Sequence, residues 1–211
     1  MTLVFTVKSS KPMNMVCLDL EGVLLPEIWI AFAEASGLTE LKRTTRDEPN
    51  YDKLMRFRLN VLEKNKIKID NIRKIINTLD PLPGAVEFTS KLMARTRTII
   101  LSDTFEEFAE PLMGKLGHPT LFCHNLEVSK DGDITGYRLR QEDQKLHAVE
   151  AFKKLNFTVI AAGDSYNDLT MIRAADYGIL FRPTDKMRSE NSDLPVATDH
   201  DALYAFIEEI L

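Results

Sequence analysis

The chain has 211 residues, of which 44% are hydrophobic and 28% are charged, as in an ordinary globular protein. Its formal net charge of −5 argues against a nucleic-acid partner, because no basic surface can displace counterions from phosphates. No apolar run approaches the roughly 18 residues of a membrane span, and Cys17 and Cys123 lack the spacing of a zinc site, so we expect a cytoplasmic protein with two buried, inert thiols.

The first 14 residues are predicted to form a disordered extension, because the apolar stretch Leu3–Val7 is too short and too poorly flanked for a signal peptide. A buried strand is predicted at residues 15–20. After it, Pro26 is placed to open a helix that ends at Gly37, since proline favours the first helical turn and glycine the position after the last.

Residues 26–83 are predicted to be helical throughout. A loop at 43–50 separates the first helix from a long helix at 51–64, and Asp70 is predicted to cap a third helix. That third helix is expected to end at Leu79. A crossover between parallel strands needs only one helix. We therefore interpret residues 26–83 as a helical cap domain inserted into the fold.

The rest of the chain alternates between predicted helices and strands. The helices are expected at residues 85–95, 106–116, 144–154, 168–174 and 201–211. The strands are expected at residues 98–102, 120–123, 126–129, 134–139, 158–162 and 178–181, with a hairpin turn at 130–133. This alternation predicts an α/β core domain with a doubly wound parallel sheet, formed by residues 15–25 and 84–211.

Three predicted strands stop at a reactive polar residue, namely Asp19, Ser102 and Asp164. In an open parallel sheet, ligands bind outside the carboxyl ends of the strands, so we expect these residues to converge. Neighbouring carboxylates repel each other unless a cation joins them, and hard oxygen ligands suit Mg²⁺. The pattern therefore predicts Mg²⁺-assisted phosphoryl transfer.

The first motif contains two acids, Asp19 and Glu21, which Gly22 allows to turn toward the same crevice. Asp19 is the candidate nucleophile, because a carboxylate can attack phosphorus and form an aspartyl phosphate. Glu21 would protonate the departing alkoxide and then deprotonate the incoming nucleophile. A solvated acidic turn is the alternative interpretation of this segment.

The second and third motifs are Ser102-Asp103-Thr104 and Lys145. The Ser102 hydroxyl and the amides that begin the next helix can donate to phosphoryl oxygens. Lys145 lies at the start of a predicted helix, where the helix dipole disfavours a cation, so a nearby phosphate would explain its position. The alternatives are a helix cap at Ser102 and a solvated surface lysine.

The fourth motif contains Asp164 at the end of an apolar strand and Asp168 four residues later. Asp164 is the candidate direct Mg²⁺ ligand. Asp168 completes the predicted metal site, and we expect it to orient the ligands through water or a hydrogen bond. A polar turn is again the alternative.

In this order and context, Asp19-Leu20-Glu21-Gly22-Val23, Ser102, Lys145 and Gly163-Asp164…Asp168 resemble the four motifs of the haloacid dehalogenase superfamily. The helical insertion resembles the small cap of its phosphoserine phosphatase branch. Three longer blocks, at residues 26–34, 101–105 and 161–168, resemble the bifunctional phosphoserine phosphatases and homoserine phosphotransferases of the threonine-biosynthesis type. The resemblance extends from residue 15 to about residue 205.

The resemblance implies that Asp19 is the phosphorylated nucleophile and Glu21 the general acid and base. It also implies that Asp19, Asp164 and the backbone carbonyl of Glu21 bind Mg²⁺, while Ser102 and Lys145 hold the phosphoryl group. Phosphoserine and homoserine are the implied substrates, without a nucleic-acid or membrane partner, and a homodimer is one option for the assembly.

In the cap, Glu27 matches the residue that contacts the substrate amino group, and Arg58 matches the one that binds the substrate carboxylate. A guanidinium can grip a carboxylate through two parallel hydrogen bonds, which agrees with that role. A cation on the helix surface is the alternative for Arg58. We place Asp103 and Asn167 among the substrate-binding residues as well, with Asn167 at the phosphate.

Most phosphatases of this superfamily carry aspartate where this chain has Glu21, whereas the resembled subfamily also has glutamate. The longer side chain suggests the hypothesis that Glu21 helps an alcohol replace water as the acceptor. Rival interpretations are a phosphatase for another small metabolite, a receiver-like binding switch, a catalytically inactive homologue and a dehalogenase. A receiver would carry its phosphorylated aspartate after the third strand, and a halide leaving group would not need the acid Glu21.

Overall fold

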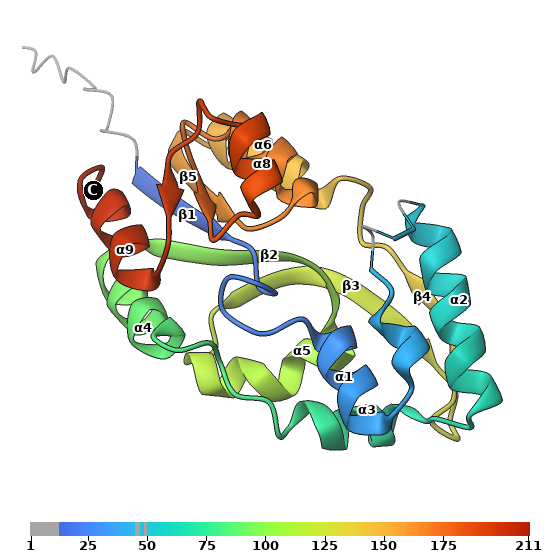
Figure 1. Ribbon diagram of the computed structural model, residues 1–211. Coiled ribbons are helices and arrows are strands. Elements are labelled where there is room, and N and C mark those ends of the chain that lie inside the picture. Colours follow the sequence, from blue (N-terminus) through green and yellow to red (C-terminus); the bar gives the residue numbers. More distant parts are fainter. Residues whose placement is uncertain (1–12, 45–46, 49) are drawn as a thin grey trace, which may run out of the picture.

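The computed structural model describes residues 13–44, 47–48 and 50–211. The described residues form one seven-stranded sheet in the order β4-β3-β2-β1-β5-β6-β7 (Figure 1). Its strands are β1 Met13–Leu18, β2 Arg97–Phe105, β3 Thr120–Val128, β4 Ile134–Arg138, β5 Phe157–Gly163, β6 Tyr177–Phe181 and β7 Val196–Ala197. All neighbouring strands are parallel except β3 and β4, which pair antiparallel.

The helices cover both faces of the sheet and one end of it. They are α1 Ile28–Ser36, α2 Tyr51–Lys64, α3 Ile69–Ile76, α4 Ala85–Arg95, α5 Glu106–Met113, α6 Gln144–Lys154, α7 Leu169–Ala174, α8 Asp185–Glu190 and α9 His200–Glu208. Three short 3₁₀ helices are η1 Thr39–Lys42, η2 Gly114–Leu116 and η3 Tyr166–Asp168. The predicted helices at 51–64, 85–95 and 144–154 are confirmed residue for residue.

The central strand β1 divides the core into two clusters. Val16 and Leu18 are buried in the cluster that includes α4, α5 and α9, whereas Cys17 points into the cluster of α6, α7 and α8. This alternation follows from the pleat of a strand that is buried on both faces. The predicted doubly wound α/β core is therefore confirmed.

The amino-terminal boundary differs from the prediction. β1 begins at Met13 and pairs with β5 from that residue onward, so the predicted extension at residues 1–14 overlaps the sheet at Met13 and Asn14. Residues 1–12 lie outside the described residues. Of the two thiols, Cys17 is buried as predicted, but Cys123 is only half-buried, and burial raises the pKa of both.

The third helix begins and ends earlier in the chain than the sequence pattern predicts. It begins at Ile69 with Lys68 as its N-cap, and it ends at Ile76, so Asp70 lies in the first turn and is not the cap. The side chain of Asn71 accepts the Lys68 N–H at 2.9 Å, and Gly132 of the hairpin accepts the Ile69 N–H at 2.9 Å. A tertiary contact thus fixes this helix start, which a local pattern cannot reveal.

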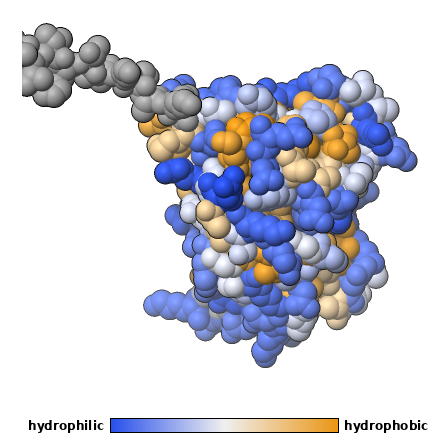
Figure 2. Space-filling view, turned by 90° about the vertical axis from the view of Figure 1, so that its left-hand side faces the viewer, coloured by the Kyte–Doolittle hydropathy of each residue, from blue (hydrophilic) through white to orange (hydrophobic). Residues whose placement is uncertain are grey.

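Other differences are local. The two short strands predicted at 120–123 and 126–129 form the single strand β3, and α8, β7 and η1 were not predicted. Part of the predicted loop at 43–50 lies outside the described residues. Among the described residues, no helix is long and apolar enough to cross a membrane. Hydrophilic side chains dominate the face in Figure 2, with hydrophobic ones between them in small groups.

We refer to residues 26–83, which contain α1, η1, α2 and α3, as the cap; its status as a separate domain remains a prediction. The β3–β4 hairpin extends from the sheet alongside α2 (Figure 1). The Tyr137 hydroxyl donates to Asp52 Oδ1 at 2.6 Å, and the Lys68 ammonium donates to the Asp131 carbonyl at 2.8 Å. These contacts join α2 and the start of α3 to the hairpin.

Candidate active site

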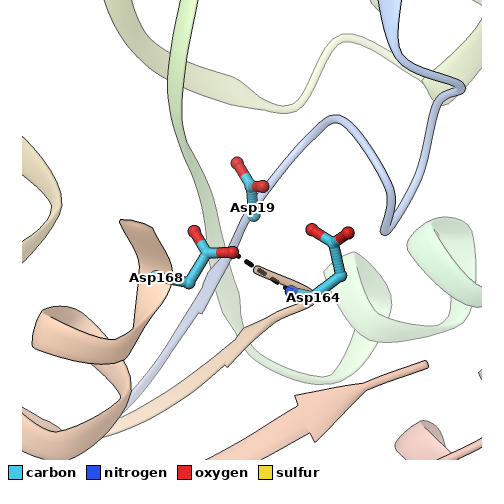
Figure 3. Close-up of side chains that lie close together, drawn as sticks. All are labelled: Asp19, Asp164 and Asp168. Atoms are coloured by element: carbon cyan, nitrogen blue, oxygen red, sulfur yellow. Dashed lines mark hydrogen bonds between the residues drawn. The ribbon is translucent and has the colours of Figure 1, made fainter. Parts of the chain in front are cut away.

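The strand ends bring the predicted acids together. Asp19 follows β1, and Asp164 follows its neighbour β5, with Asp168 at the end of η3. Each of the three offers a carboxylate oxygen, and these oxygens lie within 4.8 Å of one another (Figure 3). The convergence expected from parallel strands is therefore present.

Lys145 lies between these acids, although it is only the second residue of α6. Its side chain is 2% exposed, and its ammonium lies 2.8 Å from Asp19 Oδ1 and 2.7 Å from Asp168 Oδ1. Asp103 Oδ2 lies 3.6 Å from the same ammonium. Burial by itself lowers the pKa of Lys145, but the carboxylates of Asp103, Asp168 and Asp19 raise it well above its usual value. These carboxylates therefore favour the charged form of the lysine.

The acids carry more negative charge than Lys145 can offset. Burial and the nearby carboxylates of Asp168 and Asp164 raise the pKa of Asp19 well above its usual range, against the opposing effect of Lys145. A divalent cation would relieve this repulsion, and carboxylate oxygens are the ligands that Mg²⁺ takes. The donor set therefore fits Mg²⁺, with Asp19 and Asp164 as the candidate side-chain ligands.

Asp168 has hydrogen-bond partners on both carboxylate oxygens. Oδ1 accepts from the Lys145 ammonium, and Oδ2 accepts the backbone N–H groups of Asp164 and Ser165 at 3.1 Å each. Figure 3 draws the bond to the Asp164 N–H. This arrangement favours the orienting role over direct ligation, because Asp168 holds the lysine and the loop after β5 in place.

Two glycines permit the acids to lie this close to the backbone. Gly22 has a φ of +81°, and a Cβ there would lie 2.3 Å from Asp164 Oδ2. A Cβ at Gly163 would lie 2.4 Å from the Cβ of Asp168. A side chain at either position would displace an acid of the site.

Glu21 lies in the turn between β1 and α1. Its Oε2 accepts the N–H of Ile28, the first residue of α1, at 2.9 Å. Burial, followed by repulsion from Glu27, raises the pKa of Glu21 to about 7. A carboxylic acid is therefore available near neutral pH.

Ser102 and Asp103 lie side by side in β2 but have different surroundings. Ser102 is 2% exposed, and its Oγ accepts the Thr104 N–H at 3.2 Å, which leaves the hydroxyl proton for a phosphoryl oxygen. Although burial disfavours its charge, Lys145 holds the pKa of Asp103 well below its usual range. Asp103 also accepts from Asn167 Nδ2 at 2.9 Å. An ionised carboxylate repels a phosphate, so we assign Asp103 to positioning Lys145 and Asn167.

Arg58 of α2 is a buried cation that forms no ion pair with the residues that the structure describes. It is 7% exposed, and its guanidinium lies 4.5 Å from the centre of the Trp29 ring. One terminal nitrogen donates to the Arg43 carbonyl at 3.0 Å, but Nε has no hydrogen-bond partner, and no carboxylate of the described residues is within ion-pair distance. Burial lowers the pKa of Arg58 to about 10, so it stays charged near neutral pH. An incoming carboxylate would complete this environment.

These groups line one cavity of about 280 Å³ between the cap and the strand ends. Its lining includes Asp19, Glu27, Arg58, Ser102, Lys145 and Asn167. One end is built from acids and a lysine, and the other end carries the buried guanidinium and the exposed Glu27. The cavity thus brings together all the predicted site residues of the core and of the cap except Asp168, which lies behind Lys145.

Several residues in or beside the site were not predicted, among them Tyr51, Gln144 and His124. The Tyr51 hydroxyl donates to the Asp103 carbonyl at 3.2 Å, and Gln144 Nε2 donates to the Ser102 carbonyl at 2.5 Å. His124 is 4% exposed and lies 3.6 Å from Asp103. Gln144 could have been suspected from its place beside Lys145, whereas no pattern distinguishes Tyr51 or His124 in the sequence.

Fold and site together define a class of protein, in which a doubly wound sheet carries a buried aspartate beside a lysine and a helical cap closes over them. The family model of haloacid dehalogenase-like hydrolases matches residues 13–176. The chain belongs to this family, as the four motifs indicated.

Two relatives match nearly the whole chain. Phosphoserine phosphatase ThrH of Pseudomonas aeruginosa is 52% identical over 191 residues, which cover 90% of this chain and 93% of that protein. A phosphoserine phosphatase of Pseudomonas syringae pv. tomato is 52% identical over 187 residues, with 89% and 79% covered.

Solved structures have the same fold. A phospho-aspartyl intermediate analogue of a phosphoserine phosphatase superposes with a TM-score of 0.72 at 23% identity, covering 88% of this chain and 94% of that one. A substrate-bound phosphoserine phosphatase complex gives a TM-score of 0.72 at 22% identity, with 89% and 94% covered.

Proposed function

We propose that this chain is a Mg²⁺-dependent phosphoserine phosphatase that acts through an aspartyl phosphate on Asp19. The cavity carries this proposal, because its core end offers a nucleophile and a cation to a phosphoryl group while its cap end offers Arg58 and Glu27 to an amino acid. The names of the two Pseudomonas relatives support the same substrate.

In the first step, a carboxylate oxygen of Asp19 attacks phosphorus, and the bond from phosphorus to the serine oxygen breaks. Glu21 gives its proton to that oxygen, so serine leaves as a neutral alcohol. Lys145 and Ser102 stabilise the charge on the phosphoryl oxygens. Bound Mg²⁺, held by Asp19, Asp164 and the Glu21 carbonyl, would offset the negative charge that the acids and the phosphoryl group share.

In the second step, Glu21 is a carboxylate and takes a proton from the incoming nucleophile. With water as the nucleophile, its oxygen bonds to phosphorus, the bond to Asp19 breaks, and inorganic phosphate is released. With an alcohol as the nucleophile, the same bond changes produce a new phosphate ester. Glu21 is protonated again at the end of either route.

The cap end of the cavity accounts for substrate choice. The Arg58 guanidinium would bind the substrate carboxylate, which supplies the counter-charge that the buried cation lacks. Glu27 would pair with the substrate ammonium. Homoserine carries the same two groups, so we propose that it can enter the same cavity and serve as the alcohol acceptor.

Product analysis tests this proposal. Purified protein is incubated with phosphoserine and Mg²⁺, with and without homoserine, and serine, phosphate and phosphohomoserine are quantified. Serine release with phosphohomoserine formation would support both activities, and serine with phosphate alone would leave a phosphatase only. Absence of serine in both reactions would mean that the cap binds another metabolite. This result would contradict the roles assigned to Glu27 and Arg58.

A further inference from the structure

The helices of the cap join the core through two linkers, residues 19–27 on the way out and residues 77–84 on the way back. The linkers bond to each other, because the Leu82 N–H donates to the Leu24 carbonyl at 2.9 Å. The first linker also carries Glu21. Whatever fixes the two linkers therefore fixes both the acid and the cap residues that face the substrate.

His200, the first residue of α9, lies against both linkers. Its Nε2 is 2.8 Å from the Val23 carbonyl oxygen, and its Nδ1 is 3.0 Å from the Pro83 carbonyl oxygen. The side chain is 4% exposed. Figure 1 shows α9 beside α4, on the far side of the core from α2. Val23 directly follows Gly22, which lines the cavity, so His200 contacts the first linker just behind the site.

Both neighbours of the imidazole are acceptors. A carbonyl oxygen cannot donate, and a neutral imidazole has only one N–H, so either tautomer would leave a nitrogen lone pair facing an oxygen. A 180° flip of the imidazole ring does not help, because it places ring carbons where the nitrogens were and gives neither carbonyl an N–H donor. Only the imidazolium, with two N–H groups, satisfies both carbonyls.

Two aromatic rings lie against the imidazole. The centres of the Phe88 and Phe181 rings lie 5.2 Å and 4.9 Å from that of His200. The second linker passes closely, since a Cβ at Gly84 would lie 3.3 Å from His200 Nδ1.

We propose that His200 is a positioning residue that, as an imidazolium, bonds the Val23 and Pro83 carbonyls together and thereby sets the position of the cap over the cavity. Without it, the first linker loses its fixed place two residues after Glu21, and the second loses its anchor to α9. The kinetic consequence rests on the proposed phosphoserine phosphatase function, whereas the protonation of the ring does not.

Side-chain NMR of the full chain labelled with ¹⁵N-histidine tests the protonation directly at pH 7. We expect both ring nitrogens of His200 to carry protons, with the resonances assigned by their loss in His200→Asn. A spectrum in which one of these nitrogens is unprotonated would overturn the proposal. This measurement does not depend on any substrate.

Kinetics test the positioning role. His200→Asn and His200→Gln should lower kcat/KM for phosphoserine by roughly 10- to 100-fold, since small displacements of Glu21 and of the cap residues can have such effects. For p-nitrophenyl phosphate, which has neither an ammonium nor a carboxylate and whose leaving group needs no proton from Glu21, the burst of nitrophenolate should change by less than about threefold. His118→Asn is the matched control, because His118 is exposed and its φ of +55° suits asparagine.

Equal losses of phosphoserine turnover and of the nitrophenolate burst, or no loss of either, would contradict the positioning role in both variants. If the unmodified protein released no serine from phosphoserine, the proposed function would fail. The NMR result would then still decide whether His200 holds the linkers.

Discussion

The two ends of the cavity differ in whether their buried cation has a carboxylate partner within the protein. At the core end, the buried Lys145 contacts Asp19 and Asp168 at 2.8 Å and 2.7 Å, and these contacts exist without any ligand. At the cap end, the buried Arg58 has an unpartnered Nε and no carboxylate among the described residues within ion-pair distance. A buried charge without an ion-pair partner is costly. At the cap end, a bound substrate would supply the partner of Arg58, whereas at the core end Lys145 is already paired with carboxylates of the protein.

This difference separates chemistry from recognition. Substitutions at the core end should remove turnover of every phosphate ester, because the nucleophile and its cations act on the phosphoryl group alone. Substitutions at the cap end should discriminate among substrates according to the groups that they carry. The five predictions that follow test this separation, beginning with the largest expected effect.

Asp19→Asn should lower the release of serine by at least about 10³-fold, because an amide cannot form the acyl phosphate that splits the displacement into two steps. The loss should be as large with p-nitrophenyl phosphate. Phosphate release by both assays provides the measurement, with the exposed Asp131→Asn as the control. A variant that keeps a tenth of the activity would exclude the covalent mechanism.

Removal of divalent cations with EDTA should abolish turnover, and added Mg²⁺ should restore it. Mg²⁺ should also raise the thermal unfolding midpoint, because an ion that binds only the folded state stabilises it. Asp164→Asn should lose most of this thermal shift. An unchanged shift in that variant would contradict the assignment of Asp164 as a ligand.

Glu21→Gln should slow the release of serine by roughly 10²- to 10⁴-fold, which is the usual contribution of a positioned acid. With p-nitrophenyl phosphate, the leaving group needs no proton, so the rate at which the aspartyl phosphate forms should be far less affected. The burst of nitrophenolate, measured by stopped flow, reports that step alone.

The same residue predicts a pH dependence. Burial raises the pKa of Glu21 to about 7, so the acid form required for serine departure is lost as pH rises through that value. The rate of the first step with phosphoserine should therefore fall above about pH 7, and Glu21→Gln should lack this decline. A decline that persists in the variant would assign it to another group.

Arg58→Ala should have the smallest and most selective effect. We expect kcat/KM for phosphoserine to fall by about 10²-fold, since the substrate carboxylate loses its buried partner. Phosphoethanolamine keeps the ammonium and phosphate but lacks the carboxylate, so its turnover should change by less than about threefold. An equal loss on both substrates would refute the assignment of Arg58 to the carboxylate.

Much of this organisation follows from the sequence by itself. Apolar runs that stop at Asp19, Ser102 and Asp164 identify buried parallel strands, and parallel strands must present their carboxyl ends at one edge. Helices such as α2 and α4 were predicted within their observed bounds, because amphipathic periodicity and flanking glycine or proline are local signals.

Only the tertiary structure decided the features that depend on residues distant in the chain. The Ile69 N–H bonds to the hairpin, which moves the start of α3 away from Asp70. Tyr51 becomes part of the site only because the first residue of α2 reaches Asp103 of β2. The unpaired state of Arg58 and the two carbonyls around His200 are likewise invisible in sequence. Local propensity fixes which segments form helices and strands, but the partners of a buried charge are set by packing, and packing brings together groups that no sequence spacing relates.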